Sequence, residues 1–269
     1  MKTLLQPVCP DCNKMTNEKW DAFYNDYQSK INSDLIKKEI NDAQKTISQI
    51  DKYYFPKKND SFLELGCGLA YYCCEYYKRE MSVTGIDFSL SALNQAKKVF
   101  EKKDFNDICL VCANIEKMPF ADNSFNLIYG GGVIEHLRDP EIVLREIYRV
   151  LKPGGTVFNT VPFLNLGSLT YRQIWGNIPY FPGLKQIAEF IHVKLLKAKH
   201  MRFGWEYSFT RKYLDNVHRK CGFREIEVNR FDVELEFAFL KNKKIRNIAN
   251  NLAVNSPFFW PMVYVAAIK

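Results

Sequence analysis

The sequence contains no apolar run long enough to cross a bilayer. The longest such run covers residues 257–268, whereas a membrane-spanning helix needs about 20 consecutive apolar residues. The first residues lack the apolar core of a signal peptide, because Pro7, Pro10 and Asp11 follow at once. Most of the eight cysteines fall within expected core elements. We therefore predict a cytoplasmic protein whose thiols stay reduced.

A complete set of metal ligands is also missing. Cys9 and Cys12 have the spacing of half a zinc site, but no second cysteine pair or histidine cluster completes it. Cys109 and Cys112 share this spacing, yet side chains three apart in a strand point to opposite faces. We predict no bound metal, with zinc at the first pair as the alternative.

The charge pattern does not point to nucleic acid. The net charge is +8, but the lysines and arginines are scattered among acids and apolar residues. Neither an Asn-Pro-Pro-Tyr-like site nor an RNA-binding appendage is found. The pattern favours a solvated basic surface. The hydrophobic share of 47% is enough for a large core, and the aromatic share of 14% predicts a cavity lined with rings.

Strands and helices alternate from residue 61 onward, which predicts an α/β fold with a sheet covered on both faces. The expected strands are 61–66, 82–87, 108–113, 125–130, 155–161, 223–230 and 262–268, and the expected helices are 70–80, 90–103, 139–152 and 210–220. We divide the chain into an N-terminal helical extension, 1–60, and a main domain, 61–269, which carries an insert at 162–208.

Two helices are marked most clearly. Asp139 is placed to cap the helix at 139–152, Pro140 suits its first turn, and Pro153-Gly154-Gly155 ends it. In the extension, an apolar stripe recurs at spacings of three and four residues: Ile36, Ile40, Ala43, Ile47, Ile50 and Tyr54. Such a stripe indicates a helix packed on its own domain, and a coiled-coil seam is the alternative.

The segment 62–68, Phe-Leu-Glu-Leu-Gly-Cys-Gly, reads as a buried strand entering a glycine turn. Glu64 lies among apolar residues, where a carboxylate is costly unless a polar group meets it. Asp87 ends the next strand, where it could accept hydrogen bonds from both hydroxyls of a ribose or cap the helix that starts near Ser89. The third glycine of a dinucleotide fingerprint would fall at Tyr71. These residues predict a nucleoside site.

Five blocks in register carry a resemblance to a known family. They are Glu64-Leu65-Gly66-Cys67-Gly68, Gly85-Ile86-Asp87-Phe88-Ser89, Pro119 to Ile128, Val133-Ile134-Glu135-His136-Leu137 and Leu151-Lys152-Pro153-Gly154-Gly155. Together they resemble the class I S-adenosylmethionine-dependent methyltransferases, in particular the subgroup that includes ubiquinone-biosynthesis enzymes. The resemblance implies a Rossmann-like, seven-stranded, mostly parallel sheet and S-adenosylmethionine as cofactor.

The resemblance also assigns cofactor contacts to residues of this chain. It places Glu64, Gly66, Cys67 and Gly68 at the methionine part of the cofactor, Asp87 at the ribose, Phe88, Asn114 and Ile115 at the adenine, and Gly130 and Gly131 at the sulfonium end. Many relatives have an Asp where Asn114 stands. An Asn carbonyl still accepts a hydrogen bond from the adenine amino group, so we expect an altered contact there.

His136 is the candidate catalytic residue. It follows the fourth strand, on the rim where acceptor and methyl group would meet, and a histidine can take a proton from a hydroxyl acceptor near neutral pH. The alternative is that Glu135 and His136 only close a loop. Some related quinone methyltransferases add a metal through a carboxylate three residues before Glu135, but that position is Gly132.

The insert bears on the substrate. One helical face is apolar (Leu184, Ile187, Ala188, Ile191, Leu195 and Ala198), and cations surround it. The segment 184–202 could be a packed helix, a lid over a hydrophobic acceptor, or a peripheral contact with an anionic membrane. We predict methyl transfer to a small or lipid-like acceptor at oxygen, with nitrogen or carbon as alternatives. A non-catalytic cofactor-binding protein and an NAD-type oxidoreductase are the competing functions.

Overall fold

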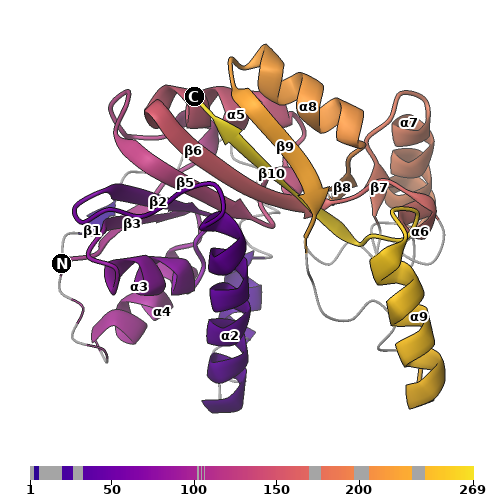
Figure 1. The fold of residues 1–269 in the computed structure, drawn as a ribbon, viewed down its shortest axis with the longest axis horizontal. Coiled ribbons are helices and arrows are strands. Elements are labelled where there is room, and N and C mark those ends of the chain that lie inside the picture. Colours follow the sequence, from indigo (N-terminus) through magenta and orange to yellow (C-terminus); the bar gives the residue numbers. More distant parts are fainter. Residues whose placement is uncertain are drawn as a thin grey trace.

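Eight strands form the central sheet in the computed structural model (Figure 1). In spatial order they are β1 (Thr3–Leu5), β4 (Cys109–Cys112), β3 (Ser82–Asp87), β2 (Ser61–Leu65), β5 (Phe125–Gly131), β6 (Leu151–Pro162), β10 (Met262–Ile268) and β9 (Arg224–Arg230). Only β10 runs antiparallel to its neighbours. The structure describes residues 3–5, 20–26, 33–101, 103, 105, 107–169, 177–196, 206–231 and 240–269.

The seven expected strands are therefore confirmed as a mostly parallel sheet. The eighth, β1, comes from the region that we expected to be helical, and it pairs in parallel with β4 at the edge of the sheet. The carboxyl ends of the parallel strands lie at one edge, where ligands bind in open α/β sheets. Leu65, Asp87, Cys112 and Gly131 mark that edge.

Helices cover both faces of the sheet (Figure 1). On one face α2 (Ser33–Ile50), α3 (Tyr71–Tyr77) and α4 (Leu90–Glu101) share a buried core with Phe62, Leu127 and Phe158. On the other face α5 (Pro140–Val150) and α8 (Arg211–Lys220) pack on Leu63 and Ile128. Residues next to one another in a strand thus serve opposite cores, as the pleat requires.

The expected stripe of the first long helix is buried against its own domain. Ala43, Ile47 and Ile50 of α2 are 0–2% exposed, and Thr46 of this helix accepts a hydrogen bond from the Tyr72 hydroxyl of α3. Burying such side chains contributes roughly 1.5–3 kcal/mol for each large aliphatic residue. The contacts favour the packed helix over a coiled-coil seam.

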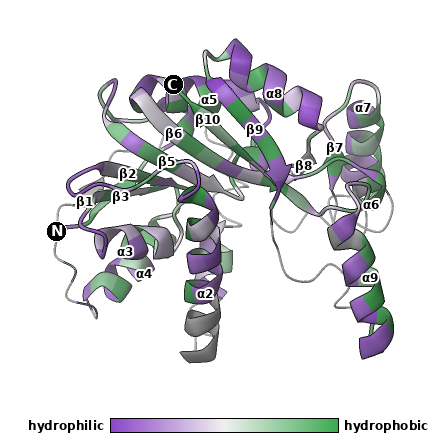
Figure 2. Ribbon diagram, in the orientation of Figure 1, coloured by the Kyte–Doolittle hydropathy of each residue, from purple (hydrophilic) through white to green (hydrophobic). Residues whose placement is uncertain are grey.

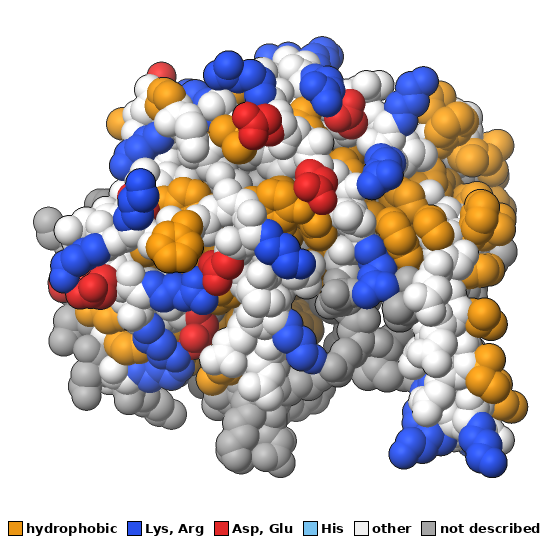
Figure 3. Space-filling model, in the orientation of Figure 1, with side chains coloured by type: hydrophobic (Ala, Val, Ile, Leu, Met, Phe, Trp, Pro, Cys, Tyr) orange, Lys and Arg blue, Asp and Glu red, His pale blue; other side chains and the backbone are white. Residues whose placement is uncertain are grey.

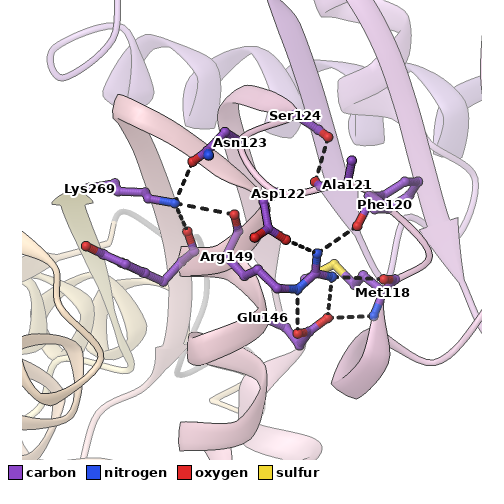
Figure 4. A network of polar contacts seen from close by, with 10 residues as sticks. Met118, Phe120, Ala121, Asp122, Asn123, Ser124, Glu146, Arg149 and Lys269 are labelled. Carbon is purple, nitrogen blue, oxygen red and sulfur yellow. Dashed lines mark hydrogen bonds and ion pairs between the residues drawn. The ribbon is translucent and has the colours of Figure 1, made fainter.

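The last turn of α5 is joined by hydrogen bonds to the loop 118–124, which precedes β5 (Figure 4). At the start of α5, Asp139 accepts a hydrogen bond from the Glu141 amide, which confirms the expected cap. In its last turn, Arg149 pairs with Glu146 and Asp122 and donates to the carbonyls of Met118 and Phe120. This network fixes the loop 118–124, which is part of a block that carries the family resemblance.

The insert contains short elements that leave the sheet. They are α6 (Leu166–Leu169), β7 (Ile178–Pro179), α7 (Leu184–Glu189), the π-type turn η4 (Phe190–Leu195) and β8 (Tyr207–Ser208). β7 and β8 form a separate parallel pair. After β9, the helix α9 (Lys243–Asn255) precedes β10. Cys9 and Cys12, the alternative zinc half-site, lie outside the described residues, as do Ala198 and the cations Lys197, Lys199 and Arg202 of the insert.

Within the described ranges, no helix is long and apolar enough to cross a membrane. The six cysteines that the structure describes are free thiols, and five of them are buried.

Candidate active site

The glycine turn after β2 is held by the buried carboxylate of Glu64. Its Oε2 accepts a hydrogen bond from the Cys73 amide at 2.8 Å, in the first turn of α3. Glu64 is 4% exposed, and burial raises its pKa to about 8 despite this hydrogen bond. The sequence-based expectation that a polar backbone group meets this carboxylate is confirmed.

Gly66 and Gly68 both have a backbone that only glycine adopts easily. Their φ angles are +55° and +52°, in the left-handed region that costs other residues about 1 kcal/mol or more. A Cβ on Gly68 would lie 2.5 Å from the hydroxyl of Tyr24, and a Cβ on Gly66 would lie 2.8 Å from Val133. The turn therefore leaves its backbone exposed to whatever occupies the cavity above it.

Asp87 lies at the end of β3, opposite this turn. Its Oδ2 accepts a hydrogen bond from the Gly68 amide at 2.9 Å, and its Oδ1 accepts one from the Ser89 amide at 2.8 Å. Burial raises its pKa to about 6, while the two amides oppose that shift. Each carboxylate oxygen has a second lone pair, so Asp87 can accept two further hydrogen bonds from vicinal hydroxyls. It fixes the turn and still offers a diol site.

A first cavity of about 120 Å³ opens beside Asp87. Phe88, Asn114 and Ile115, to which the family resemblance assigns the adenine, are among the residues that line it. The side-chain oxygen of Asn114, Oδ1, accepts a hydrogen bond from the backbone amide of Glu116 and so caps the short helix η1 (Ile115–Lys117). An amide oxygen accepts two hydrogen bonds. Asn114 is thus positioned by the turn that follows it, where its side-chain amide also donates to the Glu116 carboxylate.

A second cavity of about 270 Å³ lies on the other side of Gly66. Its walls are largely aromatic: Phe23, Tyr24, Tyr71, Tyr72 and Tyr129. The rings of Tyr72 and Tyr129 are 4.1 Å apart, and burial raises the pKa of the Tyr129 hydroxyl well above its ordinary value. The compartment therefore offers several aromatic side chains next to the glycine turn, together with the carboxyl groups of Glu39 and Glu64.

The helical segment 20–26 covers both cavities. Trp20 and Tyr24 line the first, and Phe23 and Tyr24 line the second. Three hydrogen bonds fasten the segment to the start of α4: Ser89 to Asp21, Ser91 to Asn25, and Gln95 to the Tyr24 carbonyl. The ring centroid of Trp20 also lies 5.6 Å from that of His136, edge to face. The two compartments are therefore parts of one covered site.

The structure brings most of the expected site residues together. Asp87, Phe88, Asn114, Ile115 and His136 line the first cavity, Glu64, Cys67, Gly68 and Gly131 line the second, and Gly66 lines both. Gly130 lines neither, because its Cβ position faces Asn159 on the opposite side of the sheet. Strand alternation turns Tyr129 and Gly131 toward the site and Gly130 away from it.

Sequence reasoning missed the aromatic cover. The insert was expected to bear on the substrate, but no described residue of 162–208 lines either cavity. The rings come from residues 20–24 and from α3 and β5. The spacing of Trp20, Phe23 and Tyr24 places them on one side of a helical turn, and this was the available signal.

The charges that line the site favour a cationic ligand. Glu39, Glu64 and Asp87 are the acidic residues in the two linings, and Glu64 is largely protonated near neutral pH because burial raises its pKa to about 8. No described lysine or arginine lines either cavity, although the chain carries a net charge of +8. A dinucleotide would bring a pyrophosphate, which requires cations or amides aimed at it. S-adenosylmethionine brings a sulfonium cation, a ribose and an adenine. The residues present fit that cofactor and give no support to the NAD alternative.

Known proteins agree with this geometry. A family model described as a methyltransferase domain matches residues 63–159. Demethylmenaquinone methyltransferase of Listeria monocytogenes is 30% identical over 182 residues, which are 62% of this chain and 71% of that protein. The protein of the same name from Anoxybacillus flavithermus is 27% identical and covers 64% of this chain and 73% of its own.

Solved structures share the fold. A chain of the complex between the Haloferax volcanii Trm112 methyltransferase activator and a candidate methyltransferase superposes with a TM-score of 0.64 and 16% identity, over 92% of this chain and 96% of that chain. Phosphoethanolamine N-methyltransferase 2 of Haemonchus contortus, in complex with S-adenosylhomocysteine, superposes with a TM-score of 0.59 and a sequence identity of 19%. The match covers 84% of this chain and 52% of that chain. With the sequence relatives and the site, these findings show that the chain belongs to the class I S-adenosylmethionine-dependent methyltransferases.

Proposed function

We propose that the enzyme methylates a hydroxyl oxygen of a lipid-like phenol or hydroquinone. The observation that carries this proposal is the ring-lined compartment next to the glycine turn, where Tyr71, Tyr72 and Tyr129 lie beside Gly66 and Gly131. Flat apolar rings pack well against such walls, and no described lysine or arginine is there to hold a phosphate or carboxylate. The relatives named demethylmenaquinone methyltransferase support a quinone-type acceptor.

When bound, S-adenosylmethionine would supply the methyl group from its sulfonium, with the neutral thioether as the leaving group, and the protein would supply alignment and exclusion of water. Residues 20–26 cover the site, Asp87 would hold the ribose, and the Gly66 and Gly68 backbone would hold the methionine part. The acceptor ring would lie in the second compartment, against the tyrosines. Methyl transfer to oxygen then leaves one proton to remove.

We propose His136 as the base that removes this proton; it lines the first cavity, which shares Gly66 with the acceptor compartment. Tyr71 and Tyr129 stay neutral because burial raises their pKa values, and neutral phenols are poor bases. Glu64 is buried on the Cys73 amide. Glu39 of α2 also lines the second cavity and is the competing candidate.

A transfer assay with methyl-labelled S-adenosylmethionine tests the proposal. The panel contains short-chain hydroquinones, alkyl phenols, sugars and primary amines, and the products are assigned by NMR. We expect the highest kcat/KM with a hydroquinone or alkyl phenol and a new O-methyl signal. A preference for amines or sugars would refute the acceptor class. A C-methyl product would refute only the choice of oxygen.

The base is tested by comparing His136→Asn with Glu39→Gln. General base catalysis contributes about 10²- to 10⁴-fold, so we expect the first variant to lower kcat by at least a hundredfold and to remove the acidic limb of the pH profile. The second should keep that limb. The opposite result would transfer the role to Glu39. Calorimetry with the cofactor controls for damage to the Trp20 contact.

We also propose that the described part of 184–202 contacts an anionic membrane peripherally, as expected for a lipid-like acceptor. Ala188 of this face is buried in the core, whereas Leu184, Ile187 and Leu195 are 42–62% exposed, so most of the apolar face is open to solvent. Lys185 lies over the rings of Tyr180 and Tyr207, at 4.2 and 4.7 Å, and braces the insert. Lys194 is exposed. Among the described residues of this segment, it is the cation that we expect to contact the lipid phosphates.

A further inference from the structure

Helix α9 presents its apolar stripe to solvent. Ile245, Ile248 and Leu252 recur at spacings of three and four, which puts them on one side of the helix, and they are 55–65% exposed. An amphipathic helix of a globular protein usually turns this side to the core. Figure 2 shows α9 projecting beyond the sheet with hydrophobic and hydrophilic residues along it. The helix therefore needs another apolar environment.

The end of α9 is joined to the insert by hydrogen bonds. The Asn165 side chain donates to the carbonyls of Pro257 and Trp260, at 3.0 and 2.7 Å. The Gly167 amide of α6 donates to the Phe258 carbonyl. Phe258 is 64% exposed, and so the turn after α9 and the short helix α6 offer hydrophobic side chains to solvent from adjacent positions.

These elements form one continuous apolar surface. We use "apolar flank" for the exposed hydrophobic side chains of α6, α7, η4, α9 and the turn 256–260. All but three of the large hydrophobic side chains that are exposed in the described ranges lie in residues 166–196 or 245–259. Figure 3 shows them gathered over α7 and along the outer edge of α9. Monomeric soluble proteins rarely expose so extended an apolar patch without a partner.

The charged side chains of α9 and of the segment that follows it have one sign. Lys241, Lys243, Lys244 and Arg246 lie at the start of α9, where Figure 3 shows a cluster of basic side chains at its free end. The sequence from 240 to 269 contains no Asp or Glu. Apolar side chains flanked by cations complement an anionic bilayer, where the former enter the acyl boundary and the latter stay at the phosphates.

The apolar flank lies at the same edge of the sheet as the active site. Pro162, at the carboxyl end of β6, pairs with Met262, and the turn 256–260 leads from α9 into that strand. The carboxyl ends of β2, β3 and β5 carry Gly66, Asp87 and Gly131 at this edge. A membrane on the apolar flank would thus lie on the side from which the cofactor site is built.

We propose that α9, with α6 and the α7–η4 segment, is a membrane-docking surface for anionic lipid. α9 supplies the basic end and the exposed side chains of Ile245, Ile248 and Leu252, and the docked orientation presents the carboxyl edge of the sheet to the bilayer. The proposal deepens the proposed function, because it explains how a lipid-like acceptor reaches the site, but binding to vesicles does not require that function to be correct.

The test is flotation of the full chain with vesicles of phosphatidylcholine alone or mixed equally with phosphatidylglycerol. We expect binding to the mixed vesicles that weakens with salt. Lys243→Glu with Lys244→Glu should weaken it at least twentyfold, since each cation near an anionic surface contributes about fivefold. Ile248→Glu with Leu252→Glu should abolish it. Lys97→Glu with Lys98→Glu on α4, and the exposed Phe55→Glu, are the matched controls and should bind normally.

Two results would overturn the proposal. One is equal binding by the α9 variants and the controls, or no binding of the parent chain at low salt. The other is a dimer in sedimentation velocity without vesicles that the Ile248→Glu, Leu252→Glu variant converts to monomer, because the flank would then bind a second copy. Activity on a water-soluble alkyl phenol should be unchanged in the α9 variants. Absence of that activity in the parent chain refutes the proposed acceptor and leaves the vesicle result standing.

Discussion

Replacing Asp87 by alanine should weaken cofactor binding strongly and should also lower stability, because the Gly68 and Ser89 amides lose their acceptor. The carboxylate has two lone pairs left for the ribose hydroxyls after it accepts the Gly68 and Ser89 amides. A hydrogen bond to a charged group contributes about 1.5–3 kcal/mol. Losing two of them should cost about 3 kcal/mol at least, which is roughly a hundredfold in Kd. Calorimetric titration with S-adenosylmethionine measures this change directly.

The substitution Asp87→Asn should lower the melting temperature. Both oxygens of Asp87 accept a backbone amide, whereas Asn offers one oxygen and one NH₂ group. One of the two backbone donors would then face another donor. Leaving it unsatisfied costs about 1–3 kcal/mol, so Asp87→Asn should melt several degrees below the parent chain, by differential scanning fluorimetry. Asp215→Asn, at an exposed pair with Arg219, serves as the control.

The pH dependence of cofactor binding provides a separate check. Burial raises the Asp87 pKa to about 6, and the protonated acid is a poorer acceptor for the ribose hydroxyls. The Kd should therefore rise as the pH falls below about 6, by up to tenfold per unit, and Asp87→Ala should lack this dependence. A parent Kd that stays constant from pH 7 to 5, or a variant with parental affinity, would refute the assignment of the ribose to Asp87.

Three further predictions follow from the contacts of the turn and of α5. Gly68→Ala should weaken cofactor binding and lower stability by more than Gly154→Ala, because both glycines have positive φ but only the Cβ at 68 meets a side chain, at 2.5 Å; equal losses would mean that backbone strain alone matters. Glu64 has a folded pKa of about 8, above its unfolded value, so the folded state binds the extra proton. The free energy of unfolding should fall as pH rises from about 4 to 8, by up to about 1.4 kcal/mol per unit. Glu64→Gln should flatten this slope in denaturant titrations, and parallel pH curves would contradict the argument. Arg149→Met should lower the free energy of unfolding by about 2 kcal/mol, because Arg149 joins two carboxylates and two carbonyls. The control Arg145→Met, at an exposed ion pair, should change the free energy of unfolding little. Similar losses in the two variants would show that the Arg149 network contributes no more than a surface ion pair.

Local patterns in the sequence identified the fold and the cofactor. The glycine turn with Glu64, the acid at the end of the second strand and the cap at Asp139 each depend on neighbours in the chain, and the structure places all three as expected. Short-range constraints of this kind are readable because the turn, the strand end and the helix cap are set by backbone conformation and by the residue types that permit it.

Contacts between segments that lie far apart in the sequence could not be predicted from such local patterns. The cover formed by residues 20–26 depends on hydrogen bonds to α4 some 70 residues away in sequence, and nothing in Trp20 or Tyr24 themselves specifies that partner. The same holds for β1, whose three residues join the edge of β4. The face to which Gly130 belongs was decided by the register between β5 and β6.

The sequence alone thus determined an α/β methyltransferase and its cofactor, since five local blocks in register encode the nucleoside site. Only the tertiary structure decided what surrounds the methyl group and what lies outside the core. It closed the site with an N-terminal aromatic helix rather than with the insert. It also left the apolar sides of α7 and α9 exposed, because a hydrophobic stripe specifies a helix face but not whether protein or lipid will cover it.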